Sequence, residues 1–167
     1  TPVPPIDDVL PAVEIKPGSV FVAAIDFENP GRSAAYEYMK STIPDSVSTS
    51  LARSPKVNVV SRLLLRDTVA QLNLGTNAMN VATVRRIGHI LGANSVVRGS
   101  FVEAGGKIMI NYELLDVETA KIVSSGSTRG ATGRDMFDLM DDVSATIVKD
   151  VEGYSEAYRT AHPETKK

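Results

Sequence analysis

A run rich in glycine, serine and threonine lies where phosphate-binding chemistry often occurs, between a predicted strand and a predicted helix. The run is Gly126-Ser-Thr-Arg-Gly-Ala-Thr-Gly133. Such a loop binds an anion when free backbone amides and a helix N-terminus point at the same place. The spacing, however, fits neither G-x-G-x-x-G nor G-x-x-x-x-G-K-[ST]. We therefore interpret the run as a plain glycine loop, with an anion site as the alternative.

The nucleophilic and metal-binding residue types are too sparse for a recognisable site. The chain has two histidines and no cysteine. His89 has no histidine or carboxylate three or four positions away, which argues against a metal, and we expect it at the surface. His162 falls in a polar C-terminal segment that we expect to be disordered. No serine lies in a G-x-S-x-G elbow. We predict no catalytic residue, no cofactor and no metal, and hence no enzyme.

Three aspartates have positions that recur in active sites. Asp26 comes at the end of a predicted central strand, where sites in α/β sheets often form, but the sequence nominates no partner acid or base for it. We expect its carboxylate to cap the turn at 29–31 instead. Asp141 and Asp142 are adjacent in a predicted helix, where neighbouring side chains point about 100° apart. These two carboxylates should therefore not converge on one ligand.

The composition is that of one globular domain with an uneven distribution of charge. The 167 residues are 43% hydrophobic and 23% charged, with a formal net charge of −2, which argues against general nucleic-acid binding. Residues 53–107 carry eight basic and two acidic residues, whereas residues 113–152 carry nine acidic and four basic ones. These charges could simply solvate opposite ends of the molecule. The alternatives are head-to-tail self-association and an anionic partner at the basic half.

The two ends of the chain differ in composition from the middle. Residues 1–18 contain five prolines and no hydrophobic period, which predicts an extended tether or an arm that packs on its own domain. Residues 19–152 form the predicted domain, and residues 153–167 a flexible polar tail. No apolar run approaches the roughly 20 residues that span a bilayer. We expect any contact with a membrane to come through an anchor outside this sequence.

Hydrophobic periodicity predicts the element order β-α-β-α-α-β-β-β-α. The three helices before the third strand carry apolar stripes, the last of which ends at a glycine stop, Gly92. Five strands are expected at 19–27, 57–60, 95–102, 107–116 and 121–127, and a final helix at 134–151. The fold class is therefore a single α/β domain with a mixed sheet of five strands, covered by helices and ending in an antiparallel meander.

One residue, Pro44, disturbs this regular pattern. Pro44 lies inside the helix whose stripe is Met39, Ile43, Val47 and Leu51, and a proline there removes a hydrogen bond from the carbonyl of residue 40. We expect a kink, or two helices with Ser41 or Thr42 capping the second. By contrast, Ser61 is well placed to cap the next helix.

Several short segments occur in an order that resembles the TolB amino-terminal-domain-like superfamily. The resemblance covers residues 19–151 and implies the same α/β fold. This superfamily includes CsgG-type, FlgO-type and LpoB-type envelope proteins, and sensor-like domains of some bacterial transcription activators and adenylate cyclases. One departure is Ala120, at a turn position where the family usually has glycine, because alanine disfavours positive φ. The segments are Ile25–Asn29, Val57–Arg62, Ile87–Gly92, Val96–Ser100, Ile108–Leu115, Asp116–Thr119 and Asp135–Val143.

The resemblance implies a non-catalytic accessory or assembly factor of the bacterial envelope. Such a factor would be periplasmic, anchored to the outer membrane as a lipoprotein, and would contact other envelope proteins or further copies of itself. The alternative is the extracytoplasmic sensor domain of a membrane-bound transcription regulator or adenylate cyclase.

The arginine-rich half is the predicted interface. We expect Glu in place of both Arg85 and Arg86 to weaken binding with little change in stability. The candidate interface residues are Arg32, Arg62, Arg66, Arg85 and Arg86.

Overall fold

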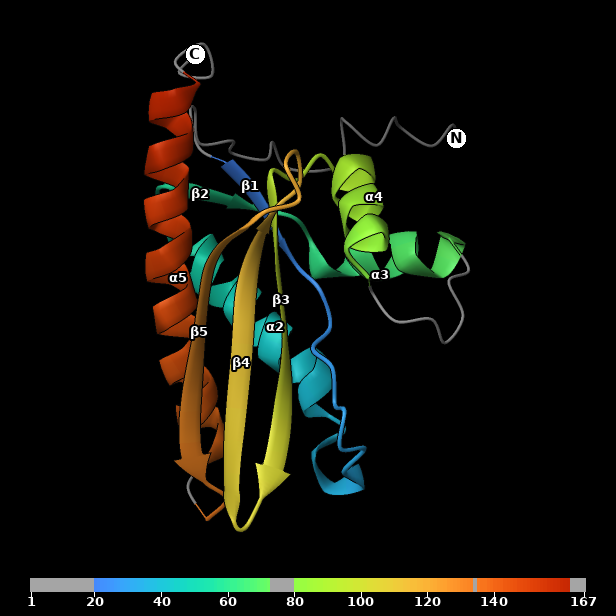
Figure 1. Cartoon of the computed structure of the whole chain (residues 1–167), viewed down its shortest axis with the longest axis vertical. Helices are drawn as coiled ribbons and strands as arrows, with labels where there is room; N and C mark the ends of the chain where they lie inside the picture. Colours follow the sequence, from blue (N-terminus) through green and yellow to red (C-terminus); the bar gives the residue numbers. More distant parts are fainter. Residues whose placement is uncertain (1–19, 73–79, 134, 163–167) are drawn as a thin grey trace, which may run out of the picture.

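The sheet has five strands in the order β2-β1-β3-β4-β5 (Figure 1). The computed structural model describes residues 20–72, 80–133 and 135–162. β1 is parallel to β2 and β3, whereas β3, β4 and β5 form an antiparallel meander, so the predicted mixed sheet is confirmed. The strands are β1 (Val20–Ala24), β2 (Val57–Val59), β3 (Ser95–Ala104), β4 (Lys107–Asp116) and β5 (Ile122–Ala131).

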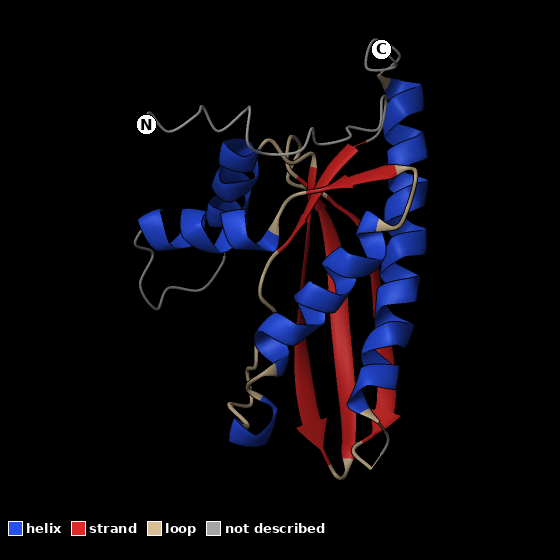
Figure 2. Ribbon diagram, turned by 180° about the vertical axis from the view of Figure 1, so that it is seen from behind, coloured by secondary structure: helices blue, strands red, loops and turns tan. Residues whose placement is uncertain are grey.

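Helices cover the two faces of the sheet unequally. α2 (Met39–Ala52) and α5 (Met136–Ala161) lie along one face (Figure 2). α3 (Arg62–Leu72) and α4 (Val81–Leu91) pack on the other face, beside β1 and the first residues of β3. A short 3-10 turn, η1 (Ala34–Tyr36), precedes α2. The far half of the meander is consequently open on the α3–α4 side, where alternate residues of β5 are exposed.

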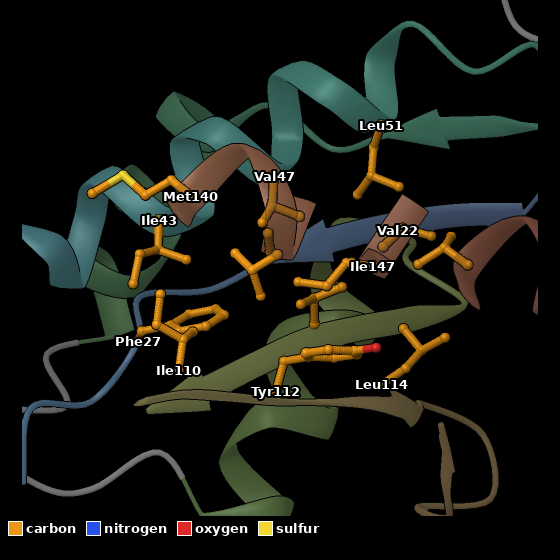
Figure 3. Packing of buried hydrophobic residues seen from close by; sticks show 14 of the residues in the cluster. Val22, Phe27, Ile43, Val47, Leu51, Ile110, Tyr112, Leu114, Met140 and Ile147 are labelled. Atoms are coloured by element: carbon orange, nitrogen blue, oxygen red, sulfur yellow. The ribbon is translucent and has the colours of Figure 1, made fainter. Parts of the chain in front are cut away.

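The main core lies between the sheet and the helices α2 and α5 (Figure 3). The predicted stripe of α2 is fully buried there, and it meets the inward-facing side chains of β4. The last helix contributes Met140, Val143, Ile147 and Val151, which are buried in the same core. Burial of this apolar surface is the dominant stabilising term in the domain. The contributing β4 residues are Ile108, Ile110, Tyr112 and Leu114.

Pro44 does not divide its helix. α2 is one helix of 14 residues, and the carbonyl of Lys40, which a proline four positions later cannot bond, accepts instead from the backbone N–H of Phe27 at 2.8 Å. Ser41 and Thr42 donate back to the carbonyl of Tyr38 and cap no second helix. The two-helix alternative is therefore wrong, because the loop after β1 supplies the missing donor.

The last helix continues ten residues beyond its predicted end at Val151. The predicted tail is therefore wrong for the described residues 153–162. Ser155 is buried and bonds two distant segments, accepting from the N–H of Val20 and donating to the carbonyl of Lys56. His162 is also ordered, since its ring stacks on Tyr158 with centroids 4.0 Å apart. These long-range contacts explain why a polar segment remains helical.

Most of the predicted glycine loop is strand. Residues 126–131 belong to β5, so neither the plain loop nor the anion site describes them. A Cβ at Gly126 would lie 2.5 Å from the hydroxyl of Tyr112, and one at Gly130 would lie 3.0 Å from Leu139. These glycines therefore make room for core side chains that cross the edge of the sheet.

Some predictions lie outside the described residues. They are the proline-rich tether at 1–18, the end of α3 at 73–75 and the start of the last helix at residue 134. The other element boundaries agree with the predictions to within a few residues. Gly92 ends α4 with a φ of 71°, and the N–H of Leu64 bonds the side chain of Ser61, as expected for the two caps.

Replacing Ala120 by glycine should raise the free energy of unfolding by up to about 1 kcal/mol. Ala120 has a φ of 64° in the turn between β4 and β5, a conformation that strains any residue with a Cβ. Urea denaturation of the two proteins measures the difference. A loss of stability in the variant would mean that the turn relaxes to negative φ in solution.

Candidate functional site

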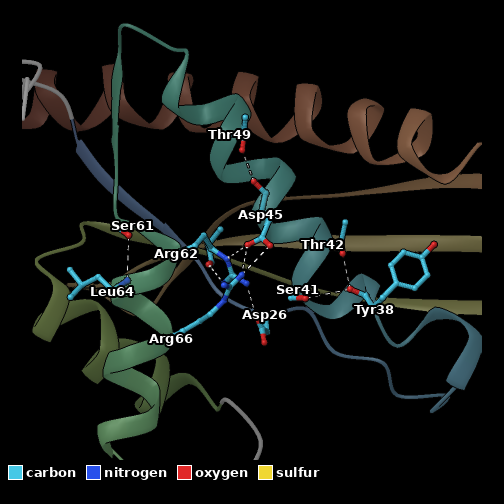
Figure 4. Close-up of polar contacts among 11 residues, drawn as sticks. Asp26, Tyr38, Ser41, Thr42, Asp45, Thr49, Ser61, Arg62, Leu64 and Arg66 are labelled. Carbon is cyan, nitrogen blue, oxygen red and sulfur yellow. Dashed lines mark hydrogen bonds and ion pairs between the residues drawn. The ribbon is translucent and has the colours of Figure 1, made fainter.

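Four charged side chains meet at the carboxyl end of β1 (Figure 4). Arg62, the first residue of α3, donates to Asp45 of α2 at 2.8 Å, to Asp26 at 2.6 Å and to the carbonyl of Ala24 at 2.8 Å. Arg66, one turn later, donates from Nη2 to both carboxylate oxygens of Asp45 at 2.8 and 3.0 Å. The N-terminal cap of α3 thus directs two arginines towards the end of the central strand.

The cluster revises two predictions. Asp26 pairs with Arg62 and does not cap the turn at 29–31, where Asn29 donates to the carbonyl of Ser33 instead. The side chain of Arg62 is only 9% exposed, so it is an internal tie between β1, α2 and α3. Arg66 is half-exposed and remains accessible at the surface.

A small cavity opens beside this cluster, between the end of β1 and α3. Its volume is about 210 Å³, and its lining combines four apolar side chains with three charged ones. The lining residues are Ile25, Asp26, Arg62, Leu65, Arg66, Val69 and Ala70.

Arg85 and Arg86 are adjacent but have different surroundings. Arg85 donates to the backbone carbonyls of Val117 and Glu118 at 2.8 and 2.7 Å, which fastens α4 to the turn before β5. Arg86 is exposed, as is Arg32 in the loop after β1. The five arginines of the predicted interface therefore divide into internal ties (Arg62 and Arg85), a half-exposed residue that pairs with Asp45, and two exposed residues.

Charge reversal should affect the stability of the domain differently at Arg85 and at Arg86. We expect Arg85→Glu to lower the free energy of unfolding by about 1–3 kcal/mol, because two carbonyls lose a charged donor. Arg86→Glu should change it by no more than about 0.5 kcal/mol. Thermal and denaturant unfolding of each single variant measures these effects. Equal effects would mean that the Arg85 hydrogen bonds to the two carbonyls stabilise the fold no more than hydrogen bonds from water would.

Large apolar side chains are exposed on α3 and α4, a feature that sequence periodicity did not single out. Leu63 and Leu64 of α3 are 66% and 52% exposed, and Ile90 of α4 is 53% exposed. The two helices extend from the side of the sheet (Figure 1). Exposed leucine and isoleucine beside an arginine such as Arg86 are typical of a protein-contact surface.

A second hollow lies along the C-terminal half of α5, beside the start of β5. It has a volume of about 750 Å³ and is walled by Tyr154, Tyr158 and His162, which follow one another at helical spacing. The hydroxyl of Tyr154 donates to Asp116 at 2.6 Å, and the backbone and side chain of Thr119 donate to the same carboxylate at 2.9 and 2.7 Å. This site was missed because the last helix was predicted to end at Val151.

Asp116 should make the domain sensitive to acid. Burial acts to raise the pKa of Asp116, but the hydrogen bonds from Tyr154 and Thr119 outweigh burial and hold the pKa below its ordinary value. A carboxyl whose pKa is lower in the folded state stabilises the fold fully above the unfolded pKa of about 3.9, and this stability disappears as the pH falls through the folded pKa.

We therefore expect the free energy of unfolding to decrease below about pH 4, and less steeply in Tyr154→Phe, which lacks one donor. The variant should also lose about 1–2 kcal/mol at neutral pH. Denaturant titrations from pH 7 to pH 2.5 measure both effects. If the free energy of unfolding falls as steeply with decreasing pH in the variant as in the parent, Tyr154 does not lower the pKa of Asp116.

The remaining titratable candidates are not assembled into a site. His89, Asp141 and Asp142 are exposed, as the sequence suggested for a surface histidine and for divergent carboxylates. Within residues 20–72, 80–133 and 135–162, no three His, Cys, Asp or Glu side chains are grouped to hold a metal ion. None of the helices in these ranges is long and apolar enough to cross a membrane.

Comparison with known proteins links the chain to envelope proteins. No family model matches the sequence. The Tol-Pal system protein TolB of Pseudomonas fluorescens is 31% identical over 136 residues, which are 79% of this chain and 28% of TolB. The match thus spans less than a third of that relative's length.

Two solved structures show the same arrangement of strands and helices. Lipoprotein GNA1162 from Neisseria meningitidis superposes with a TM-score of 0.58 at 17% identity, over 79% of this chain and 96% of that one. The LpoB C-terminal domain from Salmonella enterica gives a TM-score of 0.52 at 20% identity, over 75% of this chain and 91% of that domain. The chain therefore has the TolB amino-terminal-domain-like fold that its sequence signposts predicted.

Proposed function

We propose that this chain is a non-catalytic accessory or assembly factor of the bacterial envelope, and that it acts by contacting another protein through α3 and α4. The observation that carries the proposal is the exposure of Leu63, Leu64 and Ile90 on these helices. Burying a leucine side chain on binding contributes about 1.5–3 kcal/mol, so a few such residues suffice for a specific contact.

The proposed location is the periplasm, and the proteins similar to this chain support it. The comparison includes a lipoprotein and a component of the Tol-Pal system, which supports a periplasmic protein anchored to the outer membrane. A protein tethered at one end needs a contact surface that faces away from its attachment. α3 and α4 extend from the sheet on the side opposite α5 (Figure 2), whereas the first described residue, Val20, lies against α5 through its hydrogen bond to Ser155.

The charge distribution supports a contact with limited dependence on salt. The basic side chains near the apolar surface are partly neutralised within the domain, since Asp26 and Asp45 pair with Arg62 and Arg66. Exposed Arg86 remains available to a partner. The proposed contact is therefore mainly apolar, with an arginine at its rim.

The test compares three single variants in capture from envelope extracts of the source bacterium. Leu63→Asp and Ile90→Asp place a charge in the proposed contact, whereas Phe137→Asp places one on α5, where the side chain is 65% exposed, as much as Leu63. We expect both α3–α4 variants to reduce the captured partner at least tenfold, as for loss of about 1.4 kcal/mol or more. Thermal unfolding should remain unchanged in all three.

The proposal is overturned if capture persists in both α3–α4 variants. Light scattering of the purified chain over a range of salt concentrations then identifies self-association as a separate property. A partner that is a second copy of this chain should give a dimer that Leu63→Asp dissociates. A dimer that dissociates only as salt rises would instead mean that the basic and acidic halves meet.

A further inference from the structure

The carboxyl end of β1 is the place where the connections of this sheet change direction. The crossover from β1 to β2 runs through α2 on one face, and the crossover from β2 to β3 runs through α3 and α4 on the other. In open α/β sheets, small ligands bind outside the carboxyl ends of parallel strands at such a switch point, because the diverging connections leave a crevice there. The 210 Å³ cavity beside Asp26 occupies this position.

The inner part of the cavity is apolar, and its volume is small. Ile25, Leu65 and Val69 line it, and Leu65 is buried against the neighbouring core. Since each water molecule of the liquid occupies about 30 Å³, the cavity has room for roughly seven waters. This is below the approximately 300 Å³ of typical drug-sized sites. A branched aliphatic group of a few carbons is the natural occupant.

The mouth of the cavity carries one charge of each sign. Asp26 and Arg66 both line it, with side chains 55% and 49% exposed (Figure 4). Asp26 uses Oδ1 to accept from Arg62, and Arg66 uses Nη2 to donate to Asp45. Among the described residues no protein group bonds Oδ2 of Asp26, or Nε and Nη1 of Arg66. An acceptor and two donors are therefore free to bind a ligand.

The arrangement of charges selects the kind of ligand. A simple anion would meet Arg66 but would be repelled by Asp26 and Asp45, and a simple cation would be repelled by Arg62 and Arg66. An uncharged apolar molecule would displace the water that hydrogen-bonds both charged groups, and it would offer no hydrogen bond in return. A ligand with an ammonium and a carboxylate on the same carbon complements both groups at once.

We infer that this cavity binds a free aliphatic α-amino acid, with its carboxylate on Arg66, its ammonium on Asp26 and its side chain beside Leu65. This inference goes beyond the proposed function and is independent of the apolar surface of α3 and α4. A small ligand that bridges β1 and α3 gives the domain a sensory role, which corresponds to the alternative predicted from the sequence.

Calorimetric titration of the chain with L-leucine tests the inference. A ligand of this size should bind with a Kd between about 10 µM and 1 mM. We expect at least tenfold weaker binding for 4-methylpentanoate, which lacks the ammonium, for 3-methylbutylamine, which lacks the carboxylate, and for glycine, which lacks the side chain. Equal binding of leucine and any one of these analogues overturns the assignment of the corresponding group.

Three variants locate the ligand in this cavity. Ala70→Leu fills the cavity from its exposed rim and should abolish binding. Asp26→Asn retains an acceptor for Arg62 but removes the charge, and Arg66→Gln removes the free guanidinium donors; each should weaken leucine binding at least tenfold. The exposed Arg86→Gln is the matched control and should bind as the parent does.

Thermal unfolding of each variant establishes that it is folded. The inference is overturned if leucine does not bind the folded parent chain at concentrations up to about 10 mM. It is also overturned if Ala70→Leu binds leucine as tightly as the parent. Partner capture without leucine is a separate measurement, so failure here leaves the proposed contact through α3 and α4 standing.

Discussion

Replacement of Arg62 by methionine should lower the free energy of unfolding by about 2–4 kcal/mol. The guanidinium of Arg62 satisfies the carbonyl of Ala24 and joins two carboxylates, Asp26 and Asp45, that come from different elements. Methionine retains most of the apolar stem but donates no hydrogen bond. The variant leaves Asp26 and Asp45 close together without the cation between them, so their mutual repulsion adds to the loss.

Denaturant unfolding with Arg86→Met as the control measures this effect. Arg86 is exposed, and its replacement should change stability by no more than about 0.5 kcal/mol. Arg62→Lys should fall between the two, because an ammonium keeps the charge but does not offer the planar fork that reaches three acceptors. A loss below about 1 kcal/mol in Arg62→Met would mean that the half-exposed carboxylates are solvated well enough to need no partner.

Gly99→Ala should be at least as destabilising, with a loss of about 3 kcal/mol or more. Gly99 lies in β3 opposite Tyr112, and a Cβ there would lie 2.2 Å from the backbone oxygen of Asn111 and 2.6 Å from the ring of Phe27. This oxygen belongs to the main chain of β4, so it cannot move away without displacing the strand. Either β3 and β4 separate locally, or the buried ring of Phe27 is displaced from the core.

The matched control is Gly153→Ala, in the interior of α5. A Cβ at Gly153 meets nothing within 4 Å, and its backbone is helical, so the control should gain about 0.5–1 kcal/mol. Denaturant unfolding of both variants gives the comparison. If Gly99→Ala costs less than about 1 kcal/mol, the contact between Phe27 and β3 is looser in solution than in this structure.

The regular elements were predictable because their signals are local. The α2 stripe, the Gly92 stop and the Ser61 cap each depend on residues a few positions apart, and all three occur in the structure. The extension of α5 is held by Ser155, whose hydrogen-bond partners at Val20 and Lys56 are 135 and 99 residues away. No pattern within a window of 18 residues contains that information.

In the candidate site too, the local features were predictable and the long-range contacts were not. The sequence placed Asp26 at the end of the central strand, which is correct, but found no partner for it. Its partner, Arg62, is 36 positions later and reaches it only because α3 packs beside β1. Counting charges likewise identified a basic half, yet could not separate exposed Arg86 from Arg85, which two backbone carbonyls hold.

The bonds that Ser155 makes also set an order for folding. β3, β4 and β5 join through short turns and can pair early, since local contacts form with little loss of chain entropy. β1 lies between β2 and β3 and pairs with each only after a crossover, and Ser155 then secures the first described residue of β1 and the residue before β2. During synthesis the N-terminal strand is made first and is secured last. A chain released before α5 is complete would therefore expose the part of the core that α5 covers.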